Sequence, residues 1–165
     1  MLATMECDAA AVIASLDLAP NPAGGYVRQY HSARYPGVTE GSPMNKMITV
    51  IYYLLTLASP LARLHRVHAD GLHFHHAGGV LRIHSLGPAD DYRAELLGPP
   101  NAYQVAVAGG RWKAIELVSG PWALISEAVV PGWSPELHES ADMSLRDRVS
   151  PALWAILGPF VGDAP

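Results

Sequence analysis

Five of the eight histidines lie close together, in the stretch HRVHADGLHFHHAGG that runs from His65 to Gly79. If a strand begins near Leu72, then His73 and His75 lie on one face of it, because side chains alternate with period two along a strand. Imidazoles bind transition metals, and they also take up and release protons near neutral pH. This stretch is therefore the candidate centre of chemistry, and the remaining elements are expected to position it.

Short strands are predicted on both sides of the histidine stretch. The segment KMITVIYYLLTL at 46–57 is rich in β-branched and aromatic residues and is typical of a strand inside a sheet. Runs bounded by turn residues predict further strands at 26–31, 80–86, 92–97, 102–108, 111–118 and 122–130. Turns are expected between them at 78–79, 109–110 and 119–121. Many short strands at this spacing favour an antiparallel sandwich or barrel.

Helices are predicted at the two ends of the chain. Residues 8–18 have helical spacing with Asp8 as a possible N-cap, and residues 140–157 have helical spacing that Pro151 interrupts. The C-terminal helix is expected to pack on the outside of a barrel at about 24–135. The segment 32–45 holds prolines and glycines without periodicity and is expected to form a loop over a pocket mouth. We interpret residues 1–165 as a single domain.

Composition excludes several classes of function. The net charge is −4 and no Lys/Arg cluster occurs, so we expect no nucleic-acid partner. Cys7 is the only cysteine, which rules out a disulfide framework or a thiolate zinc site within one chain. The N-terminus is acidic where a signal peptide is basic, and no apolar run reaches the ~18 residues of a membrane span. We expect a cytoplasmic protein that does not enter a membrane.

An ordered set of segments resembles the Cupin_5 type, a small branch of the cupin superfamily. The segments span about residues 12–140 and are NPAGGYVRQY, ITVIYYLLT, LARLHRVHADG, HHAGGVLRIHSLG, YQVAVAGGRWKA and WALISEAVVPGWSPELHE. The resemblance implies an all-β fold, the double-stranded β-helix or jelly-roll barrel, with a small ligand inside. It also implies a homodimer that pairs through sheet edges.

The chain departs from the cupin pattern where metal ligands are usual. The four ligand positions fall on His65, Val67, Gly71 and Lys113, and only the first can bind a metal. This branch keeps a glutamate at the position of Gly71, and it has His and Glu where this chain has Asn21 and Ala23. The missing carboxylate predicts an enlarged cavity at Gly71, edged by His65 and by the two histidines of the strand, His73 and His75.

Three functions remain open for this cavity. The preferred one is a metal-independent isomerase, epimerase or cyclase acting on a carbonyl-bearing or sugar-like metabolite, like the sugar epimerases related to this family. In it His65, His73 and His75 carry protons, Lys113 stabilises an enolate or carboxylate, and no cofactor is needed. The first alternative is a metal-dependent oxygenase or lyase with one divalent transition metal on the same three histidines. The second is a non-catalytic binding protein, in which the histidines are buried polar groups with hydrogen bonds.

Five further side chains are candidate ligand contacts. Arg28 and Gln104 occupy positions that the family resemblance marks, and Tyr52, Tyr53 and Tyr103 lie on predicted strands from which an inward ring would line the pocket. For each tyrosine the alternative is packing in the core with a satisfied hydroxyl. The richness in Ala, Gly and Pro is consistent with a copy specialised for secondary-metabolite biosynthesis.

Overall fold

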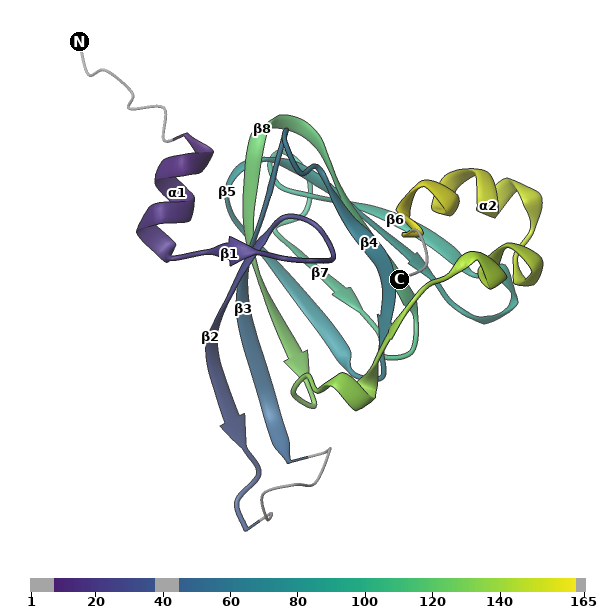
Figure 1. Cartoon of the computed structure of the whole chain (residues 1–165), viewed down its shortest axis with the longest axis horizontal. Helices are drawn as coiled ribbons and strands as arrows, with labels where there is room; N and C mark the ends of the chain where they lie inside the picture. The colour runs from purple at the N-terminus through teal and green to yellow at the C-terminus, as the bar shows by residue number, and fades with distance from the viewer. Residues whose placement is uncertain (1–7, 38–44, 163–165) are drawn as a thin grey trace.

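One curled antiparallel sheet makes up most of the protein (Figure 1). The computed structural model describes residues 8–37 and 45–162, and nine strands of this part form the sheet. The strands are β1 Ala19–Pro20, β2 Tyr26–Arg34, β3 Lys46–Thr56, β4 Leu61–Val67, β5 Asp70–Leu86, β6 Tyr92–Leu97, β7 Gln104–Val107, β8 Trp112–Val130 and β9 His138–Ser140. The predicted loop at 32–45 begins later than expected, because β2 continues to Arg34, and residues 38–44 lie outside the described residues, as does Cys7.

Two long strands, β5 and β8, pair along their whole length and connect the two halves of the barrel. The first half of β8 also pairs with β4, and its second half pairs with β3. The turns predicted at 78–79 and 119–121 are wrong, because both segments are bends inside these strands. At Gly79 the backbones of β5 and β8 lie very close, because an added Cβ there would overlap the carbonyl oxygen of Ser119, and only glycine allows this approach.

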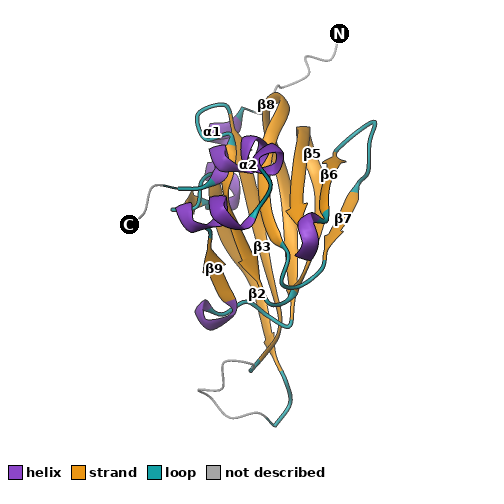
Figure 2. Ribbon diagram, turned by 90° about the vertical axis from the view of Figure 1, so that its right-hand side faces the viewer, coloured by secondary structure: helices purple, strands orange, loops and turns teal. Residues whose placement is uncertain are grey.

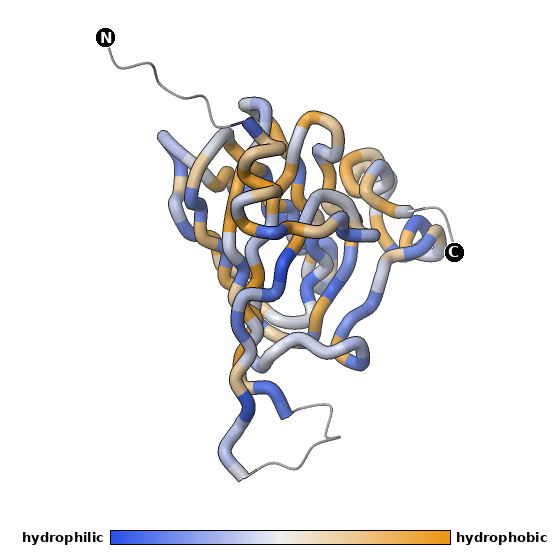
Figure 3. The backbone as a smooth tube through the Cα atoms, turned by 60° about the vertical axis from the view of Figure 1, so that its left-hand side comes forward, coloured by the Kyte–Doolittle hydropathy of each residue, from blue (hydrophilic) through white to orange (hydrophobic). Residues whose placement is uncertain are grey.

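Alternation along the strands separates a barrel interior from an outer surface. Hydropathy changes repeatedly along the tube of Figure 3, as expected for strands with one buried face. The interior cluster contains eleven buried residues, namely Tyr53, Leu55, Ala62, Leu81, Ile83, Leu97, Val105, Val107, Ile115, Ala123 and Ile125. The predicted all-β jelly-roll barrel is thus confirmed.

Two α-helices lie on the outside of the sheet (Figure 2), and Figure 1 shows that they are well separated. Helix α1, Ala9–Leu16, begins at the predicted N-cap Asp8 and packs Val12 in a cluster with Leu54. Helix α2, Pro151–Leu157, packs Leu153 and Leu157 in a second cluster that includes Leu64, Leu86 and Trp112. Four short 3-10 turns complete the described chain, at Pro88–Asp90, Pro135–Leu137, Met143–Arg148 and Gly158–Phe160.

The predicted C-terminal helix at 140–157 needs correction at its start. Residues 138–140 form β9, and α2 begins at Pro151. Proline at the first turn of a helix removes no hydrogen bond, because that N–H has no intrahelical acceptor, and the Ser150 side chain accepts from the Leu153 amide as an N-cap. Pro151 therefore starts the helix and does not interrupt it.

Candidate functional site

The barrel holds a cavity of about 330 Å³ between β2, β3, β4 and β8. Its apolar wall includes Val27, Ile51, Ala62, Ile115 and Val129. Its polar side chains include Gln29, Thr49, Tyr53, His65, Lys113, Glu127 and His138. A largely apolar cavity of this size with a few polar groups has the usual character of a small-molecule site.

Strand alternation selects these side chains, and one bulge changes the phase. Thr49, Ile51 and Tyr53 face the cavity from β3 because they are two residues apart. On β4, Ala62 and His65 both line the cavity although they are three residues apart. A shift of register lies between these two residues in the pairing of β4 with β8, and this bulge turns His65 inward.

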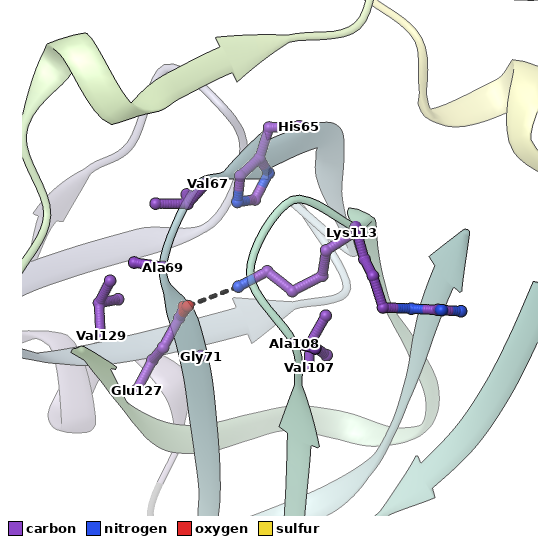
Figure 4. A pocket seen from close by; sticks show the side chains of 10 residues that line it. His65, Val67, Ala69, Gly71, Val107, Ala108, Lys113, Glu127 and Val129 are labelled. Carbon is purple, nitrogen blue, oxygen red and sulfur yellow. Dashed lines mark hydrogen bonds and ion pairs between the residues drawn. The ribbon is translucent and has the colours of Figure 1, made fainter. Parts of the chain in front are cut away.

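Lys113, Glu127 and His73 form a buried polar cluster at one end of the cavity. The Lys113 ammonium donates to Glu127 Oε1 at 2.5 Å (Figure 4). It also donates to His73 Nε2 at 3.0 Å. His73 is fully buried, and its Nδ1 lies 3.1 Å from the carbonyl oxygen of Val105. A carbonyl can only accept, so Nδ1 carries the proton and Nε2 is left to accept from lysine.

The cluster fixes the charge of its carboxylate. Burial alone would raise the pKa of Glu127, but the positive charge of Lys113 outweighs burial and holds this pKa well below its usual range. Glu127 is therefore ionised at neutral pH and neutralises Lys113. The two residues come from the two halves of β8, which the curled sheet brings face to face.

His65 is the neutral base of the site. Its ring is half-buried, and it borders the cavity beside Lys113. Burial, followed by the charge of Lys113, lowers the pKa of His65 to about 4. Its Nδ1 donates to the carbonyl oxygen of Arg63 at 2.8 Å, so Nε2 keeps a free lone pair in the neutral ring.

An aromatic wall continues from His65 towards the surface. The ring of His138 on β9 stacks on His65 with centroids 5.3 Å apart, and Trp133 meets His138 edge-on at 6.1 Å. Burial, followed by the charge of Lys113, also lowers the pKa of His138. Strand β9 holds this ring in place by pairing with β4.

Four of the predicted site residues gather at this end of the barrel, namely His65, His73, Lys113 and Tyr53. Tyr53 is 5% exposed, and its hydroxyl donates to the carbonyl oxygen of Gly24 at 2.5 Å. Burial, followed by the negative charge of Glu127, raises the pKa of this hydroxyl, so it stays protonated. Both interpretations of Tyr53 hold together, since it lines the cavity and its hydroxyl is satisfied.

The other predicted residues lie away from the cavity. His75 Nε2 donates to the carbonyl oxygen of Gly79 at 2.9 Å, near the close approach of β5 and β8. Arg28 and Tyr52 are register partners on the opposite face of β2 and β3 from the cavity residues. Arg28 is exposed and donates to the carbonyl oxygen of Leu16 at the end of α1, at 2.9 Å. The remaining two candidates, Tyr103 and Gln104, are exposed.

The cavity does not lie at Gly71, where the missing glutamate predicted space. A Cβ at Gly71 would stand 3.1 Å from Glu127 Oε1 and 3.8 Å from Lys113 Nζ. The remaining space there is about 10 Å³, enough for roughly one water molecule. The volume vacated by the lost side chain is filled by the ion pair, and the large cavity lies beyond it.

The sequence contains a pattern that indicates a buried position for Glu127. Ile125, Glu127 and Val129 alternate in the segment WALISEAVV, so the acidic residue shares a face with two buried apolar ones. A lone carboxylate on a buried face needs a partner inside the protein. Thr49 and His138 carry no such signal, because their position in the cavity follows from strand register and from the path of β9.

The donor set does not fit a divalent metal ion. In the described residues, no three His, Cys, Asp or Glu side chains converge in a metal-binding arrangement. His65, His73 and His75 each have one ring nitrogen bound to a backbone carbonyl. The free nitrogen of His73 accepts from Lys113, whose ammonium would repel a cation at this place.

A curled antiparallel sheet around an interior site defines a protein of the cupin type. Residues 10–141 match the family model described as Cupin superfamily (DUF985), and the chain belongs to this Cupin_5 family. The resemblance found in the sequence is thereby confirmed. No curated protein matches this chain. Within the described residues, no helix has the length and hydropathy needed to cross a membrane.

Solved structures share the architecture. A hypothetical protein from Leishmania major is 26% identical with a TM-score of 0.81, over 93% of this chain and 98% of that one. A Shewanella oneidensis protein is 22% identical with a TM-score of 0.82, over 95% and 99%. An oxalate decarboxylase from Bacillus subtilis is 16% identical with a TM-score of 0.55, over 87% of this chain but 34% of that enzyme. At these identities the last two similarities concern the fold alone.

Proposed function

We propose that this chain is a small-molecule enzyme that moves a proton on a carbonyl-bearing metabolite without a metal, as an isomerase, epimerase or cyclase does. The observation that carries the proposal is the Lys113 ammonium at the end of the cavity, beside the neutral ring of His65. A fixed positive group and a free lone pair are the two parts that enolisation requires.

Lys113 acts on the carbonyl oxygen of the substrate, and His65 acts on the carbon beside the carbonyl. Two of the three Lys113 N–H groups are engaged by Glu127 and His73, which leaves one for a substrate carbonyl oxygen. Negative charge that develops on this oxygen is stabilised by that hydrogen bond. His65 Nε2 takes a proton from the carbon beside the carbonyl and returns it. The enolate charge raises the pKa of His65 while the proton is held.

The proposal differs from the sequence prediction in two residues, His75 and His73. His75 is bound to Gly79 outside the cavity, so the proton carrier is assigned to His65 alone, and His73 orients Lys113. A correctly placed general base contributes about 10²–10⁴ to the rate. His65→Gln and Lys113→Met are each expected to reduce turnover by about this factor.

Solvent deuterium exchange tests the proposal. The protein is incubated in D2O with cyclic ketones and aldoses, and proton NMR follows loss of the signal beside the carbonyl. His65→Gln should abolish this exchange, whereas replacing the exposed His76 of the next strand, β5, by Gln should not change it. Exchange that is equal in all three proteins, or absent with every carbonyl compound that binds, contradicts proton transfer.

Non-catalytic binding is the second candidate. It is favoured by the complete pairing of Lys113 with Glu127 and by the weak basicity of His65 at a pKa of about 4. A metabolite that co-purifies with the protein, and that gains no deuterium when the complex is incubated in D2O, supports this function.

We also propose a homodimer that pairs through strand edges. In the described residues, β1 pairs only with Tyr26 and Val27, so residues 28–33 of β2 have no neighbouring strand on their outer side, beside the exposed rings of Tyr30 and, beyond the strand, Tyr35. Free edges favour pairing with another strand. Light scattering should give twice the chain mass of 17.7 kDa, and a value equal to one chain contradicts the dimer.

A further inference from the structure

We propose that the ligand of the cavity is an uncharged aryl ketone, and that its aromatic ring lies against Trp133 and His138 at the cavity mouth. The inference rests on the proposed function in one respect only, which is that the cavity of about 330 Å³ is the ligand site. It names the class of ligand for that site, and it does not depend on whether the bound molecule is converted.

The side chain of Trp133 is the first observation. Trp133 lines the cavity and is 36% exposed, whereas the other apolar side chains of the lining are buried or half-buried. The indole therefore stands where the cavity meets solvent. Among the described residues, the only ring that contacts it is that of His138, edge-on. A ligand that covers the rest of the indole removes apolar surface from water, which favours binding.

Three rings form a continuous row from the mouth to the proposed base. Trp133 contacts His138 with ring centroids 6.1 Å apart, and His138 contacts His65 at 5.3 Å. All three side chains line the cavity, as does Lys113. A flat ring bound along this row makes aromatic contacts that a saturated ring cannot make. Because His65 belongs to the row and is also the group beside Lys113, the ligand carbonyl is expected next to the aromatic ring, as in an aryl ketone.

The backbone holds the row of rings in place. Lys46 Nζ donates to the carbonyl oxygen of Trp133 at 3.1 Å, and the Gly132 amide donates to the carbonyl oxygen of Lys46 at 2.9 Å. At the other end of the row, β9 pairs with β4 and places His138 opposite Val67. Rings that are already held in position lose little freedom when a ligand binds, so more of the contact energy appears as affinity.

The charges of the cavity favour an uncharged ligand. Lys113 and Glu127 cancel, and the lowered pKa values of the two histidines in the row keep both rings neutral at pH 7. An anionic ligand would have to compete with Glu127 for the only lysine of the cavity lining. Since much of the wall is apolar, a charged ligand would also lose its water without gaining a partner.

The test compares two ketones with the same carbon skeleton. The probes are 1-tetralone, which has an aromatic ring beside its carbonyl, and 1-decalone, which is fully saturated, titrated with ligand-observed NMR at pH 7. The wild-type protein should bind 1-tetralone about threefold to tenfold more tightly, as one aromatic contact allows. An apolar wall without aromatic contacts would favour the more apolar decalone. The anion 1-naphthoate, which is similar in size, should bind more weakly than 1-tetralone.

Substitutions of Trp133 separate aromatic contact from bulk. Trp133→Leu should abolish the preference for 1-tetralone, and Trp133→Phe, which keeps a ring, should retain most of it. Tyr103→Leu is the matched control, because Tyr103 is 62% exposed and does not line the cavity, and it should leave the preference unchanged. In the wild-type protein, the indole N–H signal of Trp133 should shift when 1-tetralone is added, a readout that needs no variant.

Four results overturn the inference on binding alone, namely equal or tighter binding of 1-decalone, a preference that survives Trp133→Leu, tighter binding of 1-naphthoate, and no binding of either ketone. An unmoved indole signal overturns it as well. So does a change of solution mass in Trp133→Leu, because the indole would then be a contact between subunits. Binding with the expected preference but without deuterium exchange upholds the inference and contradicts the proposed proton transfer alone.

Discussion

Replacing Glu127 by glutamine is expected to cost the fold about 3–5 kcal/mol, because the Lys113 ammonium then stays buried without a counterion. The two charged groups are 2.5 Å apart, and Lys113 is 5% exposed, so water cannot solvate the remaining charge. For a chain of this size, that loss lowers the Tm by roughly 6–20 °C. Urea unfolding at pH 7, followed by circular dichroism, measures the free energy of unfolding.

The second half of the experiment removes both charges. Lys113→Met alone leaves the Glu127 carboxylate unpaired and should cost a similar free energy. The double variant Lys113→Met/Glu127→Gln buries neither charge, and it should lie within about 2 kcal/mol of the wild type. Its loss of stability should therefore be far smaller than the sum of the two single losses, which is the sign of direct coupling.

A surface ion pair provides the matched control. Arg66 and Glu139 form a salt bridge at 2.6 Å, but their side chains are 29% and 42% exposed. Glu139→Gln should therefore cost only about 0–1 kcal/mol. If Glu127→Gln costs no more than this control, or if the two single losses simply add, then the buried ion pair is not the structural centre of the site and the reasoning is refuted.

Three further predictions concern pH, a hydroxyl and metal removal. Because the folded pKa of His65, about 4, is below its unfolded value near 6.5, stability is fully present above pH 6.5 and should fall by up to about 3 kcal/mol as the pH drops to 4. His65→Gln should reduce this fall without removing it, because the lowered pKa values of His138, His84 and His76 act in the same direction; the fall due to Glu127, whose pKa is also lowered, begins only below about pH 4.5. Tyr53→Phe leaves the Gly24 carbonyl unpaired and should cost about 1–3 kcal/mol in urea unfolding; a neutral result would mean that water replaces the hydroxyl. Incubation with EDTA should leave the Tm unchanged, and elemental analysis of untagged protein should find less than stoichiometric Fe, Mn, Ni, Cu and Zn; a stoichiometric metal or a lowered Tm contradicts the reading of the donor set.

Local sequence was enough for most of the elements. The β-branched run at 46–57 and the short runs at 26–31 and 92–97 correspond to β3, β2 and β6, and Asp8 begins α1 as an N-cap. These features depend on residue type and on neighbours within one turn or one strand. The ordered motifs added the barrel, because they preserve the sequence of strands in the family.

Where the long strands bend was not determined locally. The glycine pair at 78–79 and the segment 119–121 are compatible with a hairpin turn and equally with a close approach of two continuous paired strands. The choice depends on the contact between Gly79 and Ser119, which are forty positions apart in the chain. Because that contact forms only in the folded barrel, local propensity cannot decide it.

The site, too, has features that the sequence indicates and features that depend on tertiary contacts. The sequence by itself predicted a candidate site that includes His65 and His73, and the family resemblance predicted that the usual metal ligands are replaced, as at Lys113. Only the tertiary structure decided that the volume freed at Gly71 is filled by Glu127 and Lys113, which belong to opposite halves of one strand. The physical reason is that a buried charge takes the partner that the packing of the sheet brings within reach, whatever the distance between the two along the chain.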